Sequence, residues 1–158
     1  MWNDRRLLDL FEIDHPILQA PMAGAANSEL VAEVSGAGAL GGFGAAGSSP
    51  DGLRSTIREI RARTDRPFNI NLFNACTEEY DQESRPGQRL SGLLETYHAE
   101  LSLGRVPDPV PLFGPAVAQL EVLLGEGAPV ISFHFGVDAR TLSRAHDAGQ
   151  GFSVRRRP

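Results

Sequence analysis

The sequence predicts an α/β fold built from parallel β/α units, and two features of the chain support this prediction. Short apolar runs alternate with amphipathic segments, and glycine or proline stands between them. The apolar runs carry hydrophobic residues at consecutive positions, which is typical of strands that are buried on both faces of a parallel sheet. The connections are short, so right-handed crossovers between neighbouring strands are expected.

The first part of the chain supplies three strands and two helices in alternation. Strands are expected at 16–20, 38–43 and 67–73, and helices at 27–36 and 49–64. Asn27 or Ser28 can cap the first helix, and Gly36 ends it. The second helix is amphipathic because Leu53, Ile57 and Ile60 recur at helical spacing, with arginines on the other faces.

From residue 74 the alternation is interrupted and then resumes. Residues 74–115 are polar and proline-rich, with a helix expected at 88–101; such long connections are usually functional or mobile. A helix at 115–125, a strand at 129–135 and a helix at 138–149 follow. A further apolar strand is expected next, but the chain reads QGFSVRRRP, in which GFSV offers only a short strand. Four units suggest the first half of an eight-unit barrel, which typically needs ~250 residues; a doubly wound domain fits the pattern as well.

Composition excludes several classes of function. The net charge is -5 and the sequence pI is about 5.3, so neither nucleic acid nor an anionic membrane is an expected partner. The chain has no lysine, which excludes a Schiff-base lysine and a phosphate-binding P-loop. Cys76 is the single cysteine, so an internal disulfide is impossible. No apolar stretch approaches the ~18 residues of a membrane span, and we expect a soluble, cytoplasmic protein.

Candidate site residues lie where the predicted strands end, because ligands bind at the carboxyl ends of parallel strands. The turn from Ala20 to Gly24 follows the first strand, and its small residues would allow a planar ligand to approach closely, although a tight turn alone explains them. Asn69 and Asn71 share one face of the third strand. His134 lies at the tip of the fourth strand. The set contains neither a carboxylate pair nor a cluster of metal ligands, so no metal is predicted.

The two asparagines and the histidine each allow more than one interpretation. A buried amide needs partners for its oxygen and for its NH2 group, and these could be loop backbone or the polar edge of a flat heterocycle such as a flavin. Asn71 lies nearer the end of the strand and is the better candidate. His134 could be a packed core residue, part of a pocket wall, or a group that moves a proton.

Three blocks together resemble one family. The segments HPILQAPMAG at 15–24, PFNINLF at 67–73 and VISFHFG at 130–136 are similar, in order and spacing, to the nitronate monooxygenases, formerly called 2-nitropropane dioxygenases. The resemblance runs from about residue 5 to residue 149, and it covers only the first half of the family's usual length. It implies an FMN-dependent TIM barrel that oxidises alkyl nitronates with dioxygen to a carbonyl compound and nitrite.

The resemblance also implies roles for individual residues. Ala20, Pro21, Met22 and Ala23 would lie along the flavin, Asn69 and Asn71 would bind it, and His134 would line the substrate pocket. The family's usual catalytic base belongs to a later segment, so no catalytic residue is expected in this chain. We therefore expect a truncated form with weak or no activity, in which 1–149 is a partial barrel and 150–158 an aberrant tail. The alternatives are an FMN-dependent enoyl reductase and a non-catalytic half-barrel that self-associates as a homodimer.

Overall fold

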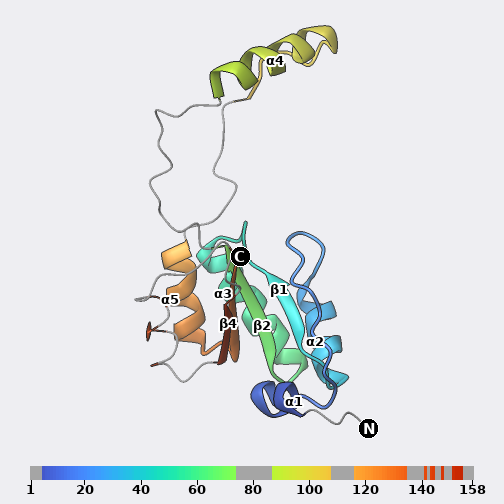
Figure 1. Cartoon of the computed structure of the whole chain (residues 1–158), viewed down its shortest axis with the longest axis vertical. Coiled ribbons are helices and arrows are strands. Elements are labelled where there is room, and N and C mark those ends of the chain that lie inside the picture. Colours follow the sequence, from blue (N-terminus) through green and yellow to red (C-terminus); the bar gives the residue numbers. More distant parts are fainter. Residues whose placement is uncertain are drawn as a thin grey trace. The chain divides into compact units, whose positions relative to one another are not determined.

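The computed structural model describes residues 5–73, 87–107, 116–134, 141, 143–144, 147 and 151–154. The chain divides into two compact units (Figure 1), one formed by Met1–Cys76 with Leu112–Pro158 and the other by Thr77–Pro111. The first unit contains the sheet, and the second contains a single described helix.

Four parallel strands in sequential order form the sheet of the first unit. They are β1 (Gly41–Gly44), β2 (Phe68–Phe73), β3 (Val130–His134) and β4 (Gly151–Val154), and each pairs with the next. This arrangement confirms the predicted fold class of parallel β/α units. The short strand offered by GFSV is β4, whereas residues 155–158 and most of the helix expected at 138–149 lie outside the described residues. The division at residue 149 between barrel and tail stays a prediction.

The helices of the first unit begin where the sequence supplies a cap. In α2 (Ser28–Gly36) the Asn27 side chain accepts a hydrogen bond from the backbone N–H of Leu30 at 2.8 Å. In α3 (Pro50–Arg63) Ser49 accepts one from the N–H of Gly52 at 3.1 Å, and Pro50 occupies the first helical position. The third predicted helix of this unit is α5 (Ala116–Glu126). These three helices confirm the sequence prediction to within one or two residues at each end.

Two predictions near the N-terminus were wrong. Segment 16–20 is not a regular strand: its one ladder contact is an isolated parallel bridge between Leu18 and Leu40. Proline has no N–H to donate to a ladder, so Pro21 prevents the pairing from continuing. The strand expected at 38–43 begins only at Gly41, because Gly38 turns the chain with a φ of +87°. The short helix α1 (Arg6–Phe11) was not predicted at all.

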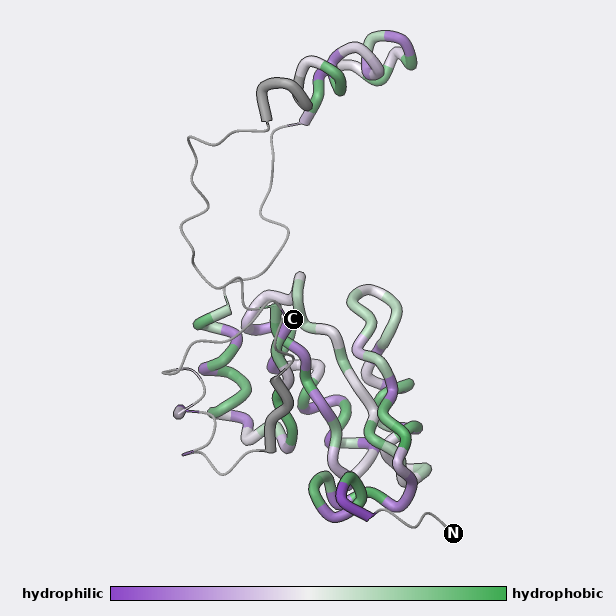
Figure 2. The backbone as a smooth tube through the Cα atoms, viewed as in Figure 1, coloured by the Kyte–Doolittle hydropathy of each residue, from purple (hydrophilic) through white to green (hydrophobic). Residues whose placement is uncertain are grey.

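The two faces of the sheet are covered differently. Phe68, Ile70 and Leu72 of β2 alternate toward a core that also contains buried residues of α2, α3 and α5. A smaller cluster lies against the other face, where the strands begin, and consists of Leu8, Phe11, Ile13, Leu40 and Val130. Figure 2 shows the apolar stretches of the helices as green segments along the sheet. We call the face covered by α3 and α5 the outer face, and the opposite one the inner face.

The second unit contains α4 (Gly87–Glu100), which confirms the helix expected at 88–101. The chain turns back after it through Ser102 and Gly104, both at positive φ. Leu93, Tyr97 and Leu101 are exposed. Across the described parts of both units, no helix has the length and apolar character needed to cross a membrane; the cytoplasmic location stays a prediction.

Candidate functional site

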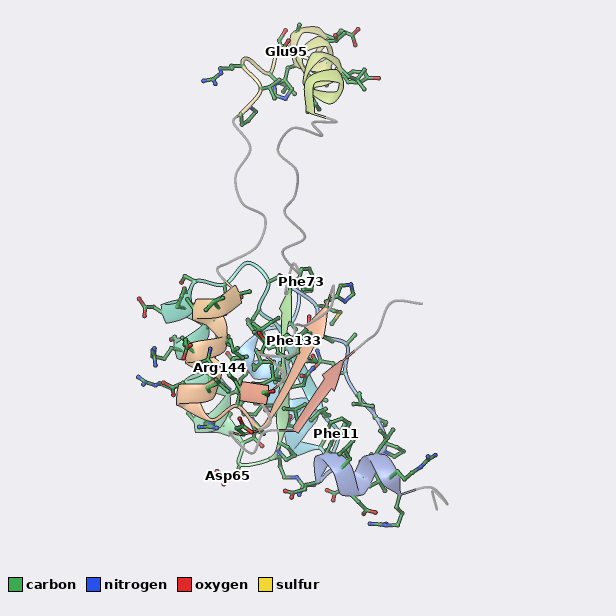
Figure 3. The ribbon with its side chains drawn as sticks, turned by 60° about the vertical axis from the view of Figure 1, so that its left-hand side comes forward. Phe11, Asp65, Phe73, Glu95, Phe133 and Arg144 are labelled. Carbon is green, nitrogen blue, oxygen red and sulfur yellow. The ribbon has the colours of Figure 1, made fainter. Side chains whose placement is uncertain are left out.

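The strand register places the predicted polar residues on the inner face in three successive levels. Side chains of paired residues in a parallel ladder point to the same face. From the beginning of the strands to their carboxyl ends, the levels are Gly42 with Asn69 and Val130, then Gly44 with Asn71 and Ser132, then Phe73 with His134. The two-residue period predicted that the asparagines share a face, and the register confirms this placement. Figure 3 shows Phe73 at one end of the sheet and Phe11 at the other.

Asn71 lies at the middle level and is almost completely buried, with 6% of its surface exposed. Its Nδ2 donates a hydrogen bond to the Oγ of Ser132 at 2.9 Å. This contact fixes the orientation of the amide across the two strands. Ser132 was not predicted as a site residue, although the two-residue period of the strand counted back from His134 places it on the same face.

Asn69 lies one level deeper and is 8% exposed, and its Oδ1 is buried without a hydrogen-bond partner in the described structure. The residue faces a cavity of about 220 Å³, whose other lining residues are Phe11, Leu18, Gln19, Ala20, Pro21, Leu40, Val130 and Ser132. An unsatisfied buried acceptor costs about 1–3 kcal/mol. The cavity lining is mostly apolar, and its polar side chains are the amides of Gln19 and Asn69 and the hydroxyl of Ser132. The site is therefore suited to a ligand with an N–H or O–H on an otherwise flat or apolar body.

The segment Ala20–Ala23 lies directly on the glycines of β1. A Cβ added at Gly42 would come within 2.6 Å of the backbone oxygen of Gln19, and one added at Gly44 within 2.6 Å of the backbone nitrogen of Ala23. Only glycine leaves room for a main chain at these two positions. Ala20 and Pro21 line the cavity, whereas Met22, which is 42% exposed, and Ala23 are not among its lining residues.

His134 lies at the rim of the inner face and is exposed. Its ring centroid is 5.2 Å from that of Phe73, with the two planes tilted by 32°. This exposure does not fit a packed core histidine, and the interpretations as a pocket wall or as a proton-transferring group stay predictions. The structure thus brings together Ala20, Pro21 and Asn69 around one cavity and places Asn71 and His134 at successive levels toward the rim.

Among the described residues, the ionisable groups whose pKa values are shifted lie elsewhere, between α3 and α5. Arg58 and Arg54 donate hydrogen bonds to Glu126 at 2.8 to 3.2 Å. These contacts, with that from Arg58 first, lower the pKa of Glu126, and the same contact raises the pKa of Arg58. The cluster ties two helices together and lies away from the residues that line the cavity. In the part of the chain that the structure describes, no three histidine, cysteine or acidic side chains converge as metal ligands would.

The parallel β/α units, in sequential order, are those of the first part of a TIM barrel. The sequence pattern of the nitronate monooxygenase family matches residues 4–154, and the chain belongs to this family. A nitronate monooxygenase from Paraburkholderia phytofirmans is 41% identical over 137 residues, which are 84% of this chain and 37% of the relative. One from Pseudomonas aeruginosa is 38% identical over 149 residues, or 90% and 41% of the two lengths.

Solved structures show the same relationship. Nitroalkane oxidase from Streptomyces ansochromogenes matches with a TM-score of 0.76 and 33% identity, over 94% of this chain and 41% of that one. FabK from Thermotoga maritima matches with a TM-score of 0.66 and 28% identity, over 94% and 36%. The chain thus spans less than half the length of each of these four proteins.

Proposed function

We propose that this chain forms one wall of an FMN site for the oxidation of alkyl nitronates by dioxygen, with a carbonyl compound and nitrite as products. The observation that carries the proposal is the cavity that Asn69 lines together with Ala20 and Pro21, where Asn69 is a buried amide whose Oδ1 has no partner in the described structure. Membership of the nitronate monooxygenase family supports the choice of a flavin as the ligand.

The residues present fit a flavin. Its pyrimidine edge has acceptors and one N–H donor, so the oxygen of Asn69 or Asn71 can accept from it and an amide NH2 can donate to it. Ala20 and Ala23 carry only methyl groups, so a flat ring can approach the backbone of this segment closely at these two positions. The Met22 thioether gives a polarisable, partly exposed contact at the same edge. When bound, the flavin would supply the electron transfer that these side chains cannot perform.

His134 would bind and orient the substrate, and it would not act as the base that accepts a proton. Among the inner-face side chains named above it is the ionisable one, and it lies at the rim beside Phe73. An imidazole N–H there can donate a hydrogen bond to an anionic nitronate and orient it. Because no carboxylate shares these levels of the described sheet, we propose that a proton-accepting group comes from elsewhere and that the chain alone has weak or no activity.

Visible absorbance of the purified protein is the direct test. The proposal expects FMN to bind in a 1:1 ratio, and expects Asn71→Leu to weaken that binding at least tenfold. Nitrite release from propane-2-nitronate measures turnover, and oxidation of a nicotinamide cofactor would instead favour the enoyl reductase alternative. A colourless protein that binds no added FMN would contradict the proposal. Light scattering on the same sample tests the proposed homodimer.

A further inference from the structure

Gln19 makes a pair of hydrogen bonds that resembles one rung of a parallel sheet. Its Nε2 donates to the backbone oxygen of Gly42 at 3.1 Å, and its Oε1 accepts from the backbone N–H of Gly42 at 3.1 Å. A side-chain amide carries the same donor and acceptor as a peptide group. The Nε2 also donates to the oxygen of Ala20 at 3.1 Å.

The preceding hydrogen bonds show which rung is replaced. The N–H of Leu40 donates to Ile17, and the N–H of Gln19 donates to Leu40, both at 2.9 Å. If the ladder continued, Gly42 would donate to the backbone oxygen of residue 19 and accept from the N–H of residue 21. Residue 21 is a proline and has no N–H. The Gln19 side chain supplies both missing partners of Gly42.

Because the Gln19 side chain pairs with Gly42 in place of the main chain, the backbone after Gln19 can turn away from the strand ladder. The backbone of Gln19 and Pro21 lies over the inner side of Gly42, and that of Met22 and Ala23 lies over Gly44. The N–H groups of Ala25 and Ala26 then donate to the oxygen of Met22 at 3.1 and 2.8 Å and close a turn. Without the side-chain rung, Gly42 would lose its partners on this side.

We propose that Gln19 is a positioning residue for the ligand-binding segment Ala20–Ala23, a role that nothing in its sequence context suggests. It keeps β1 paired at Gly42 while holding this segment on the inner face, where Ala20 and Pro21 line the cavity. The inference rests on the proposed function only for the identity of the ligand, FMN. Gln19 itself moves no proton and carries no charge; it acts through the placement of its neighbours.

The test uses Gln19→Met, which keeps the length of the side chain and removes both hydrogen bonds with Gly42 and the one to the oxygen of Ala20. We expect the amide of Gly42 to exchange its hydrogen at least tenfold faster and the dissociation constant for FMN to rise at least tenfold. Ile57→Val is the control, because it trims a fully buried side chain of α3 in the outer core and leaves the inner face intact. It should bind FMN as the wild type does.

A double variant separates positioning from stability. Gln19→Met with Pro21→Ala restores an N–H at residue 21, so the main chain can form the ordinary rung with Gly42. Slow exchange at Gly42 should return, whereas FMN affinity should stay low because the segment is drawn back into the ladder. Recovery of both would show that Gln19 serves stability alone and would overturn the inference.

The remaining outcomes are equally decisive. Unchanged exchange at Gly42 in Gln19→Met would overturn the pairing itself. Equal loss of FMN affinity in Gln19→Met and Ile57→Val would overturn the positioning role. A wild-type protein that binds no FMN would overturn the proposed function, and the exchange measurement would still decide whether Gln19 forms the rung.

Discussion

The outer and inner faces of the sheet differ in the kind of side chain that they carry. Alternate residues of the same strand point to opposite faces, so one strand supplies both kinds. In β2, Phe68, Ile70 and Leu72 are at most 1% exposed in the outer core, whereas Asn69 and Asn71 between them carry polar groups to the inner face. Both faces have one buried amide oxygen without a partner in the described structure, Oε1 of Gln119 in α5 on the outer side and Oδ1 of Asn69 on the inner side, but the cavity lies on the inner face. The difference suggests that stability resides in one set of positions and ligand binding in the other.

The largest expected effect comes from the outer face. Ile70→Ala removes a side chain with 0% exposure from the middle of β2, and such truncations cost about 2–5 kcal/mol. Chemical denaturation monitored by circular dichroism measures the loss. Val117→Ala, at a position that is 72% exposed, is the control and should stay within about 0.5 kcal/mol of the wild type. Similar losses of unfolding free energy in both variants would show that stability does not depend on the buried positions of the outer face.

Gly44→Ala should combine a moderate loss of stability with a large loss of binding. The new Cβ would meet the backbone nitrogen of Ala23 at 2.6 Å, so the ligand-binding segment must move, and overpacking of this kind costs about 1–3 kcal/mol. Thermal unfolding and FMN titration measure the two effects. Gly47→Ala adds the same methyl group where nothing lies within 4 Å, and it should leave FMN affinity unchanged. An unaltered affinity in Gly44→Ala would place the ligand away from Ala20–Ala23.

Asn69→Leu should separate stability from binding. Replacing a buried amide whose oxygen has no partner by an apolar side chain of similar size removes a desolvation penalty. We expect the free energy of unfolding to stay within about 1 kcal/mol of the wild type or to rise, while FMN affinity falls. A stability loss as large as that of Ile70→Ala would show that Asn69 is a structural residue.

The smallest effect concerns the ion cluster between α3 and α5. The lowered pKa of Glu126, held down by hydrogen bonds from Arg58 and Arg54, means that its ionised form stabilises the fold. That contribution is fully present above the ordinary carboxyl pKa near 4.5 and is lost as pH falls through the lowered value. Melting temperatures of the wild type and Glu126→Gln should therefore differ at neutral pH and converge in acid. A constant difference across this range would assign the effect to something other than ionisation.

Much of the fold followed from local patterns in the sequence. The spacing of Leu53, Ile57 and Ile60, together with Ser49 and Pro50, was sufficient to predict α3. The alternation in β2 was sufficient to place Asn69 and Asn71 on one face. These signals act over a few residues, so they are visible in a linear sequence.

The parts that could not be predicted depend on contacts between distant residues. Gln19 bonds Gly42 from 23 positions away, and the side chain of Gln119 donates to the backbone oxygens of Ala45 and Ser48 from 74 and 71 positions away. No local pattern marks either glutamine. Segment 16–20 was predicted as a strand because its apolar residues suit one, but Pro21 has no N–H to donate and only the bridge between Leu18 and Leu40 forms.

The contacts of Glu126 with Arg54 and Arg58 have a consequence for how this chain could be modified. They join residues 68 and 72 positions apart, one on each side of the separate unit Thr77–Pro111. The helices α3 and α5, which precede and follow that unit in the chain, are held together by packing and ion pairs, and the entropy of closing a loop changes only slowly with its length. The position between β2 and α5 should accept segments of very different size, and it is a natural place to graft a foreign sequence.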